Sequence, residues 1–261
     1  MKRTLDLLFP LLLAVAVLAA WEATVDAKHI PPYILPAPSA ILAALAANWT
    51  TLWASMLTTI AVTLEGFAGA LVVAVALAIL FSQSRLAERA LYPYAVILQV
   101  TPMVAIAPLI LIWVGFERIN FALALIAGMI AFFPILSNAT QGLKSADFNL
   151  LDLTRLYGAS RWQTLVKVQM PSALPALLTG MKIGIVIALI GEVTAEFAAG
   201  SGTASGLAWR IVESGNRLEI ATLFAALALL ALTGILFFAA LSLLEWALLR
   251  RWHESAIRRE I

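Results

Sequence analysis

Long apolar runs separated by short polar segments dominate this chain. A helix needs about 20 apolar residues to cross a hydrocarbon layer of about 30 Å. The pattern predicts six such spans, at residues 7–21, 58–81, 91–114, 119–136, 176–199 and 220–249. We therefore predict an all-α polytopic membrane protein that forms a single transmembrane domain over residues 1–261.

Composition agrees with this prediction and excludes several function classes. Hydrophobic residues make up 62% of the chain and charged residues only 12%, which is too few for an ordinary soluble surface. The chain has no cysteine, so disulfides and cysteine metal sites are excluded. Its two histidines, His29 and His253, are far apart in sequence, and we assign no metal site. A net charge of +2 gives no reason to expect a nucleic-acid partner.

Basic residues alternate between the connecting segments and predict the orientation. Cytoplasmic loops carry an excess of Lys and Arg. One side holds most of the 17 basic residues, namely Lys2, Arg3, Arg85, Arg89, Lys144, Arg155, Arg161, Lys167, Arg250, Arg251, Arg258 and Arg259. The other side holds Lys28, Arg118, Arg210 and Arg217. We therefore place both termini and residues 144–172 in the cytoplasm, and the loops at 22–56 and 200–218 on the opposite side.

The first span allows two interpretations. Lys2 and Arg3 followed by an apolar run is also the pattern of a cleaved signal peptide. Five further spans follow, which favours a retained helix. The next connection reads PPYILPAPS (residues 31–39), and its prolines predict a stiff, extended segment outside the membrane.

Three prolines interrupt the third span. Pro93, Pro102 and Pro108 each remove a backbone donor that lipid cannot replace. A helix broken three times is expected either to line a cavity or to pack as a kinked helix among others. On the first interpretation Pro102, Met103 and Pro108 are candidates for the translocation pathway.

Two carboxylates one helical turn apart, Glu192 and Glu196, lie in the fifth span. A charge at the centre of a bilayer costs about 2.5–3.5 kcal/mol on insertion scales, so such groups usually face the helix bundle or water. Three interpretations are open: they line the outer vestibule, they bond to neighbouring helices, or they form a proton-coupled pair. The first makes both residues candidates for the pathway.

Other residues of the spans suggest packing roles. Lys182 lies near the cytoplasmic end of its span, where we expect it to snorkel. Gly180 and Gly184 begin a stripe of small residues that lets helices approach closely. Glu65, in the second span, is expected on a polar face packed inside the bundle.

Residues 149–171 contain the signals of two short helices. Asn149, with Asp152 three residues later, predicts the first cap, and Gly158 predicts a left-handed stop. Ser160 and Gln163 form a capping box for a second helix, which Pro171 is expected to end. The second helix is basic and amphipathic, so it either lies on lipid or docks into a groove of another protein. The rigid corner favours docking.

This segment resembles the cytoplasmic EAA loop of ABC importer permeases. That loop reads Glu-Ala-Ala, three residues, Gly, nine residues, Ile, one residue and Leu-Pro. Asp152 takes the place of the Glu, Gly158 that of the Gly, and Val168 that of the Ile, with Met170 and Pro171 for Leu-Pro. Residues 153 and 154, Leu and Thr, depart from the two alanines. Residues 34–45, 101–116 and 195–202, the last followed by residues 205–211, are similar to the nitrate/sulfonate/taurine branch of these permeases.

The resemblance implies a type I ABC importer permease in a bacterial inner membrane. It implies that a small solute, either sulfonate-, taurine- or nitrate-like or a small organic nutrient, is delivered by a periplasmic or lipid-anchored substrate-binding protein. A second permease copy would complete the pathway. The residues that would couple to an ATPase are Asp152, Tyr157, Gly158, Ala159, Ser160, Arg161, Trp162 and Pro171.

The chain lacks a Gly-x-x-x-x-Gly-Lys-Ser/Thr phosphate loop. We therefore expect ATP and Mg to be bound by the partner subunit, and this chain itself to be no enzyme and to bind no cofactor. The alternative function is an ion-coupled secondary transporter, which would work without the ATPase.

Overall fold

The computed structural model describes the backbone of residues 2–200 and 205–250, with the side chains in these ranges except those of residues 2–7 and 116. The side chains of Lys2 and Arg3, residues 201–204 of the loop predicted at 200–218, and Arg251, Arg258 and Arg259 lie outside the described residues. The elements are α1 (Lys2–Ala27), α2 (Pro38–Ala47), α3 (Trp49–Gln83), α4 (Arg85–Val100), α5 (Met103–Val114), η1 (Phe116–Arg118), α6 (Ile119–Lys144), α7 (Phe148–Leu156), α8 (Arg161–Thr164), the π-helical turn η2 (Leu165–Gln169), α9 (Met170–Ala199), α10 (Leu207–Asn216) and α11 (Ile220–Leu249).

The described helices confirm the prediction of an all-α polytopic protein. Five are long and apolar enough to cross a membrane, and the bent pair α4–α5 makes up to six. Several extend beyond the predicted spans, since α3 begins at Trp49 and α6 continues to Lys144. Hydropathy marks only the part of a helix that lipid requires to be apolar, whereas backbone hydrogen bonding continues into the polar flanks.

The chain forms two compact units. The first comprises Met1–Thr58 and Ser205–Ala231, and the second comprises Thr59–Ala204 and Leu232–Ile261. In the first unit, Trp21 packs edge-on against Phe224 with ring centroids 5.9 Å apart. There the Nε of Arg210 donates a hydrogen bond of 2.9 Å to the Ser55 hydroxyl, which ties α10 to α3.

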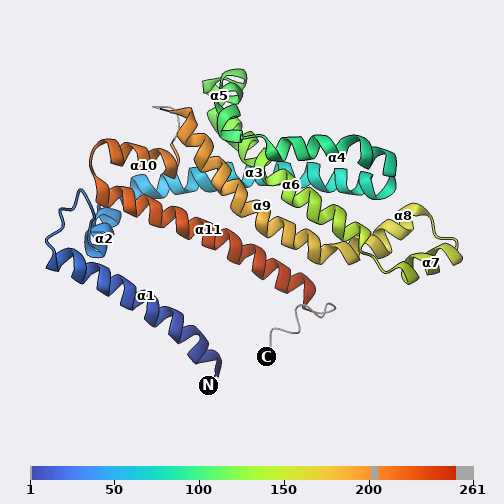
Figure 1. Ribbon diagram of the computed structural model, residues 1–261, viewed down its shortest axis with the longest axis horizontal. Coiled ribbons are helices and arrows are strands. Elements are labelled where there is room, and N and C mark those ends of the chain that lie inside the picture. The colour runs from blue at the N-terminus through green and yellow to red at the C-terminus, as the bar shows by residue number, and fades with distance from the viewer. Residues whose placement is uncertain (1, 201–204, 251–261) are drawn as a thin grey trace. The chain divides into compact units, whose positions relative to one another are not determined.

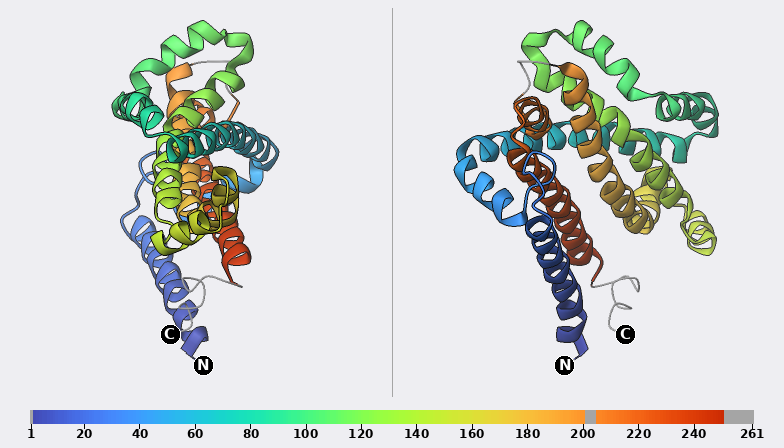
Figure 2. Two further views of the ribbon diagram at one scale, coloured as in Figure 1. Left: turned by 90° about the vertical axis from the view of Figure 1, so that its right-hand side faces the viewer. Right: turned by 60° about the vertical axis from the view of Figure 1, so that its left-hand side comes forward.

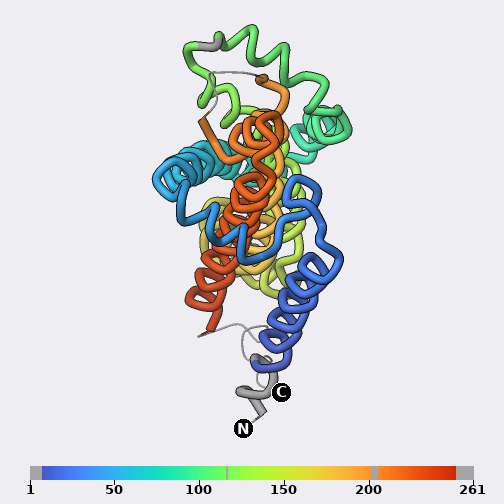
Figure 3. Tube along the Cα trace, turned by 90° about the vertical axis from the view of Figure 1, so that its left-hand side faces the viewer, coloured from blue at the N-terminus to red at the C-terminus, as the bar shows by residue number. Residues whose placement is uncertain are grey.

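The proline-rich connection between α1 and α2 is not extended as predicted. The N–H groups of Ile34 and Leu35 both donate to the Pro31 carbonyl, so the chain makes a helical turn. Pro38 then starts α2, a position that proline favours because it lacks an N–H that would have no partner there. The Ser39 N–H and hydroxyl donate to the Glu22 carboxylate at 3.0 and 2.5 Å, which joins α2 to α1. Figure 3 shows the trace of these first helices in blue.

Helices α6 and α9 pack side by side in the second unit (Figures 1 and 2). The predicted stripe of small residues faces α6. A Cβ on Gly180 would lie 2.7 Å from the Asn138 Cβ, and one on Gly184 would lie 2.8 Å from Ile135 Cγ1. The stripe is therefore confirmed as the surface on which the two helices meet.

Helix α3 crosses α6 at an even closer contact. A Cβ on Gly66 would lie 2.3 Å from the Ala124 carbonyl oxygen, and one on Gly128 would lie 2.7 Å from the Gly66 carbonyl oxygen. The two backbones therefore touch with no side chain between them.

The third predicted span is broken once, not three times. Helix α4 ends at Val100 and α5 starts at Met103, with a bend of 99° between them. Thr101 is extended (ψ 125°), as steric crowding by the following Pro102 requires. Pro93 and Pro108 lie inside α4 and α5 without ending them.

Lys182 does not snorkel as predicted. Its ammonium lies 2.7 Å from the carboxylate of Glu245 on α11, and the two side chains are 15% and 19% exposed. A carboxylate on the facing helix holds the ammonium inside the unit, a pairing that the sequence of α9 alone could not reveal.

Candidate functional site

The corner between α7 and α8 begins with a cap that differs from the prediction. The Asp147 carboxylate accepts a hydrogen bond of 2.8 Å from the Asn149 N–H, and α7 starts at Phe148. Asn149 is therefore not the cap but the donor to it. Both residue types cap well, so the sequence did not distinguish between them.

Gly158 ends α7 in the left-handed conformation, as predicted, with φ +68°. The Ala159 N–H donates to the Thr154 carbonyl at 2.9 Å, and the Gly158 N–H donates to the Arg155 carbonyl at 3.0 Å. This pair of bonds is the Schellman motif, which satisfies the last carbonyls of the helix.

The predicted capping box at the start of α8 is also confirmed. The Gln163 N–H donates to the Ser160 hydroxyl at 3.2 Å, and the Ser160 N–H donates to the Gln163 side chain at 2.8 Å. The hydroxyls of Thr154 and Thr164 are 3.3 Å apart and join the two helices. Hydrogen bonds thus fix the corner on both sides of Gly158.

Pro171 does not end the second helix, which corrects the prediction. Residues Arg161–Ala199 form one continuous helix, with the π turn of Leu165–Gln169 directly before Pro171. A proline ring crowds the carbonyl four residues earlier, and a wider turn relieves that crowding. The Gln83 amide at the end of α3 bonds to Gln169 in this turn at 3.3 Å. No loop therefore separates α8 from α9.

The outer surface of the corner is apolar and exposed. Leu156, Tyr157 and Trp162 are 85%, 82% and 67% exposed, and Leu153 beside them is also exposed. We call these four residues, together with the exposed Arg161, the docking face. Asp152 forms an ion pair of 2.8 Å with Arg155. Figure 1 shows the corner at one end of the α6–α9 pair. The structure thus places Asp152 and residues 157–162 of the predicted coupling set at the corner, whereas Pro171 lies beyond the π turn near the start of α9.

The predicted pathway residues lie on two other elements. Pro102 and Pro108 are exposed at the start of α5 and within it, and Met103 is buried. Glu192 and Glu196 on α9 are each 1% exposed, so neither carboxylate faces open solvent in this conformation. Among the described residues, neither oxygen of the Glu192 carboxylate has a hydrogen-bond partner.

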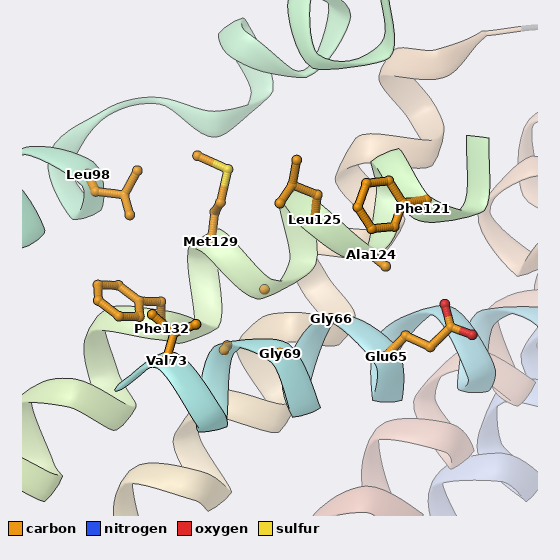
Figure 4. Close-up of a pocket in the computed structure, with 12 residues that line it drawn as sticks. Glu65, Gly66, Gly69, Val73, Leu98, Phe121, Ala124, Leu125, Met129 and Phe132 are labelled. Carbon is orange, nitrogen blue, oxygen red and sulfur yellow. The ribbon is translucent and has the colours of Figure 1, made fainter. Parts of the chain in front are cut away.

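A pocket that the sequence did not predict lies among α3, α4 and α6 (Figure 4). Its volume is about 510 Å³. It is lined by Glu65, Gly66, Gly69, Ala70, Val73, Leu98, Phe121, Ala124, Leu125, Gly128, Met129 and Phe132. Glu65 is exposed at its edge, not packed inside the bundle as predicted. The sequence did contain one signal that could have indicated this pocket, namely the single carboxylate of Glu65 near the middle of a span.

A comparison with family models decides the class of the protein. Residues 70–252 match the family described as the binding-protein-dependent transport system inner membrane component. The chain belongs to this family. It is a permease of the ABC importer class for small solutes, as the resemblance of the 149–171 segment predicted.

Individual relatives match this permease over most of its length. It is 35% identical to the riboflavin transport system permease protein RibX of Chloroflexus aurantiacus, over 91% of this chain and 87% of the relative. It is 31% identical to the formylaminopyrimidine transport permease protein ThiX of Halalkalibacterium halodurans, over 95% and 98%. The taurine transport system permease protein TauC of Escherichia coli is 26% identical, over 90% and 86%, and supports the predicted branch.

A solved structure supports the fold of the permease. The inward-facing MetNI methionine ABC transporter matches with a TM-score of 0.58, covering 76% of this chain and 94% of that chain at 20% identity. This likeness confirms the predicted type I ABC importer permease fold.

Proposed function

We propose that the permease is driven by an ATPase subunit that docks on the docking face from the cytoplasm of a bacterium, with both of its termini on that side of the inner membrane. The ATPase binds ATP and Mg. A periplasmic or lipid-anchored substrate-binding protein delivers the solute, and a second copy of the chain completes the pathway. Membership of a binding-protein-dependent transport family supports these classes of partner.

The observation that carries the proposal is an exposed apolar face on a rigid corner. Leu156, Tyr157 and Trp162 project from a corner whose backbone is fixed on both sides of Gly158. Tyr and Trp contribute most to protein interfaces when buried at their centre, often about 2 kcal/mol or more each. A face that only rested on lipid would need no such corner.

The solute path is proposed along α5 and α9. Helix α5 contacts both α6 and α9, and α9 continues from α8 without a loop. Movement of the corner would therefore move Glu192 and Glu196, while Pro102, Met103 and Pro108 lie on the helix packed beside them. We assign these five residues to the translocation pathway.

The solute itself is proposed to be a small organic nutrient or a small oxyanion. The relatives are named for riboflavin, formylaminopyrimidine, aliphatic sulfonates, taurine and nitrate.

Docking can be tested by cross-linking, because the chain has no cysteine and any introduced thiol is unique. In native membranes, Ala159→Cys carrying a thiol-directed cross-linker is expected to capture a nucleotide-hydrolysing subunit, because Ala159 lies at the corner but outside the docking face. Leu86→Cys is the matched control, since Leu86 is 79% exposed on α4 and next to the basic Arg85 of the predicted cytoplasmic side.

Equal capture at both positions, or capture at neither in any nucleotide state, would refute docking at the corner. Uptake driven by an ion gradient in vesicles that contain this chain alone would instead support a secondary transporter.

The rigid corner makes a separate prediction at Gly158. Proline cannot adopt φ +68° and would also remove the N–H that bonds to Arg155. In reconstituted complexes, Gly158→Pro is expected to lower solute-stimulated ATP hydrolysis to the basal rate while the chain still folds, because the spans are unaffected. Gly158→Asn is the control, since Asn tolerates the left-handed conformation and should retain most of the stimulation. Stimulated hydrolysis in the Pro variant would contradict the coupling role.

A further inference from the structure

We infer that the pocket among α3, α4 and α6 is a solute-binding site for a flat, ring-bearing molecule that presents an N–H donor or a positive charge to Glu65. This inference rests on the proposed import function, specifies the class of solute, and adds a binding site beside the path proposed along α5 and α9, since α6 contacts both of those helices. It also implies that small anions are poor ligands of this pocket.

The walls of the pocket suit an aromatic ring. They are formed mainly by apolar side chains, including Phe121 and Phe132, with the flexible thioether of Met129 between them (Figure 4). Ligand pockets in proteins typically have about 300–1,000 Å³, with apolar and aromatic walls and a few polar groups that fix orientation. A volume of about 510 Å³ falls in this range.

Glu65 supplies the polar group. It lies near the middle of α3, where a carboxylate that faced lipid would be strongly unfavourable. It is exposed at the edge of the pocket, and among the described residues it makes no hydrogen bond or ion pair. A carboxylate only accepts hydrogen bonds, so a complementary ligand must bring a donor or a positive charge.

The glycines of α3 keep the pocket preformed and empty of side chains. The contact between Gly66 and Gly128 fixes the crossing of α3 and α6 beside the pocket. One turn further, a Cβ on Gly69 would meet no atom within 4 Å, so this residue borders open space. The room at Gly69 is therefore available to a ligand.

The charge of the lining also selects against anions. Among the side chains that the structure describes, no Lys, Arg or His lines the pocket, and the charged residue of the lining is Glu65. A nitrate or sulfonate group placed here would be repelled by the carboxylate and would find no cation. A lipid chain fits the walls but leaves the carboxylate without a partner, which makes the ring-bearing solute the better occupant.

The test is equilibrium binding to the full chain in lipid nanodiscs. The probes are riboflavin, an aminopyrimidine, taurine and nitrate. We expect at least one ring compound to bind and neither anion to compete with it. Glu65→Gln is expected to weaken ring binding about tenfold by removing the charge, and Gly69→Leu to abolish it by filling the pocket. Gly69→Ala is the matched control, which adds one methyl group at the same open position and should bind nearly as the wild type does.

Three results would overturn the inference. These are ring binding that is unchanged in both Glu65→Gln and Gly69→Leu, anions that bind as tightly as the rings, and no binding by any probe. A change only in co-purified lipid, or only in the association of two copies, on Gly69→Leu would likewise assign the pocket to another occupant.

The Ala159→Cys cross-link separates this inference from the proposed function. If the ATPase is captured but no ring compound binds, the assignment of the pocket is refuted and the proposed import function is retained. If ring compounds bind as expected but no ATPase is captured, docking at the corner is refuted and the assignment of the pocket is retained.

Discussion

Replacing Gly66 with Val is expected to prevent the permease from accumulating as a stable, monodisperse protein. Even a single Cβ at this position would lie 2.3 Å from the Ala124 carbonyl oxygen and 3.0 Å from the Gly128 nitrogen. These are backbone atoms, so no rotamer change relieves the overlap and α3 and α6 must separate. Overpacking typically costs about 1–3 kcal/mol, and we expect this variant at or above the upper end of that range.

The measurement is the thermal midpoint of the purified chain in detergent, together with its elution profile on gel filtration. Gly69→Val is the control, because it adds the same side chain to the same helix at a position with open space. Equal midpoints for the two variants would show that the α3–α6 crossing does not limit stability.

Replacing Lys182 with Met is expected to destabilise the permease by about 3 kcal/mol. The change leaves the Glu245 carboxylate, which is 19% exposed, without its partner inside a membrane-spanning helix. Removing one member of a buried ion pair costs about 3–5 kcal/mol, mainly because the remaining charge is unpaired. We expect the lower end of this range, since the side chains of Lys182 and Glu245 are both partly exposed.

A second substitution separates this cause from a simple loss of packing. Lys182→Met combined with Glu245→Leu removes both charges and should recover most of the lost stability. Arg155→Met serves as the surface control, because its pair with Asp152 is 79% and 49% exposed and should contribute at most about 1 kcal/mol. A double variant no more stable than Lys182→Met alone would contradict the unpaired-charge explanation.

Local rules predicted much of the fold and of the corner. The spans follow from runs of apolar residues, because a helix in lipid must satisfy its own backbone hydrogen bonds. The stop at Gly158 and the capping box at Ser160 depend on residues within one turn of each other. Each of these two features depends only on residues that are neighbours in the sequence, and the structure confirms both.

Features that depend on distant residues could not be predicted. Pro93, Pro102 and Pro108 looked alike in the sequence, yet only Pro102 breaks the span. The partner of Lys182 lies on a helix far along the chain. The pocket arises because Gly66 and Gly128 bring α3 against α6, and neither run of sequence by itself indicates that contact.

The π turn before Pro171 fixes the length of the chain between the docking face and α9. A π turn holds about one residue more than an α turn, and each residue of an α-helix rotates the next by about 100°. Losing that extra residue would restore a regular helix and leave Trp162 at nearly the same angle about the axis, because the π turn already absorbs it. Adding a further residue, or removing two, would instead rotate Trp162 by about 100° relative to the glycines that meet α6. The segment between Thr164 and Pro171 is therefore expected to tolerate the loss of one residue but not the gain of one, although none of these residues need touch a partner.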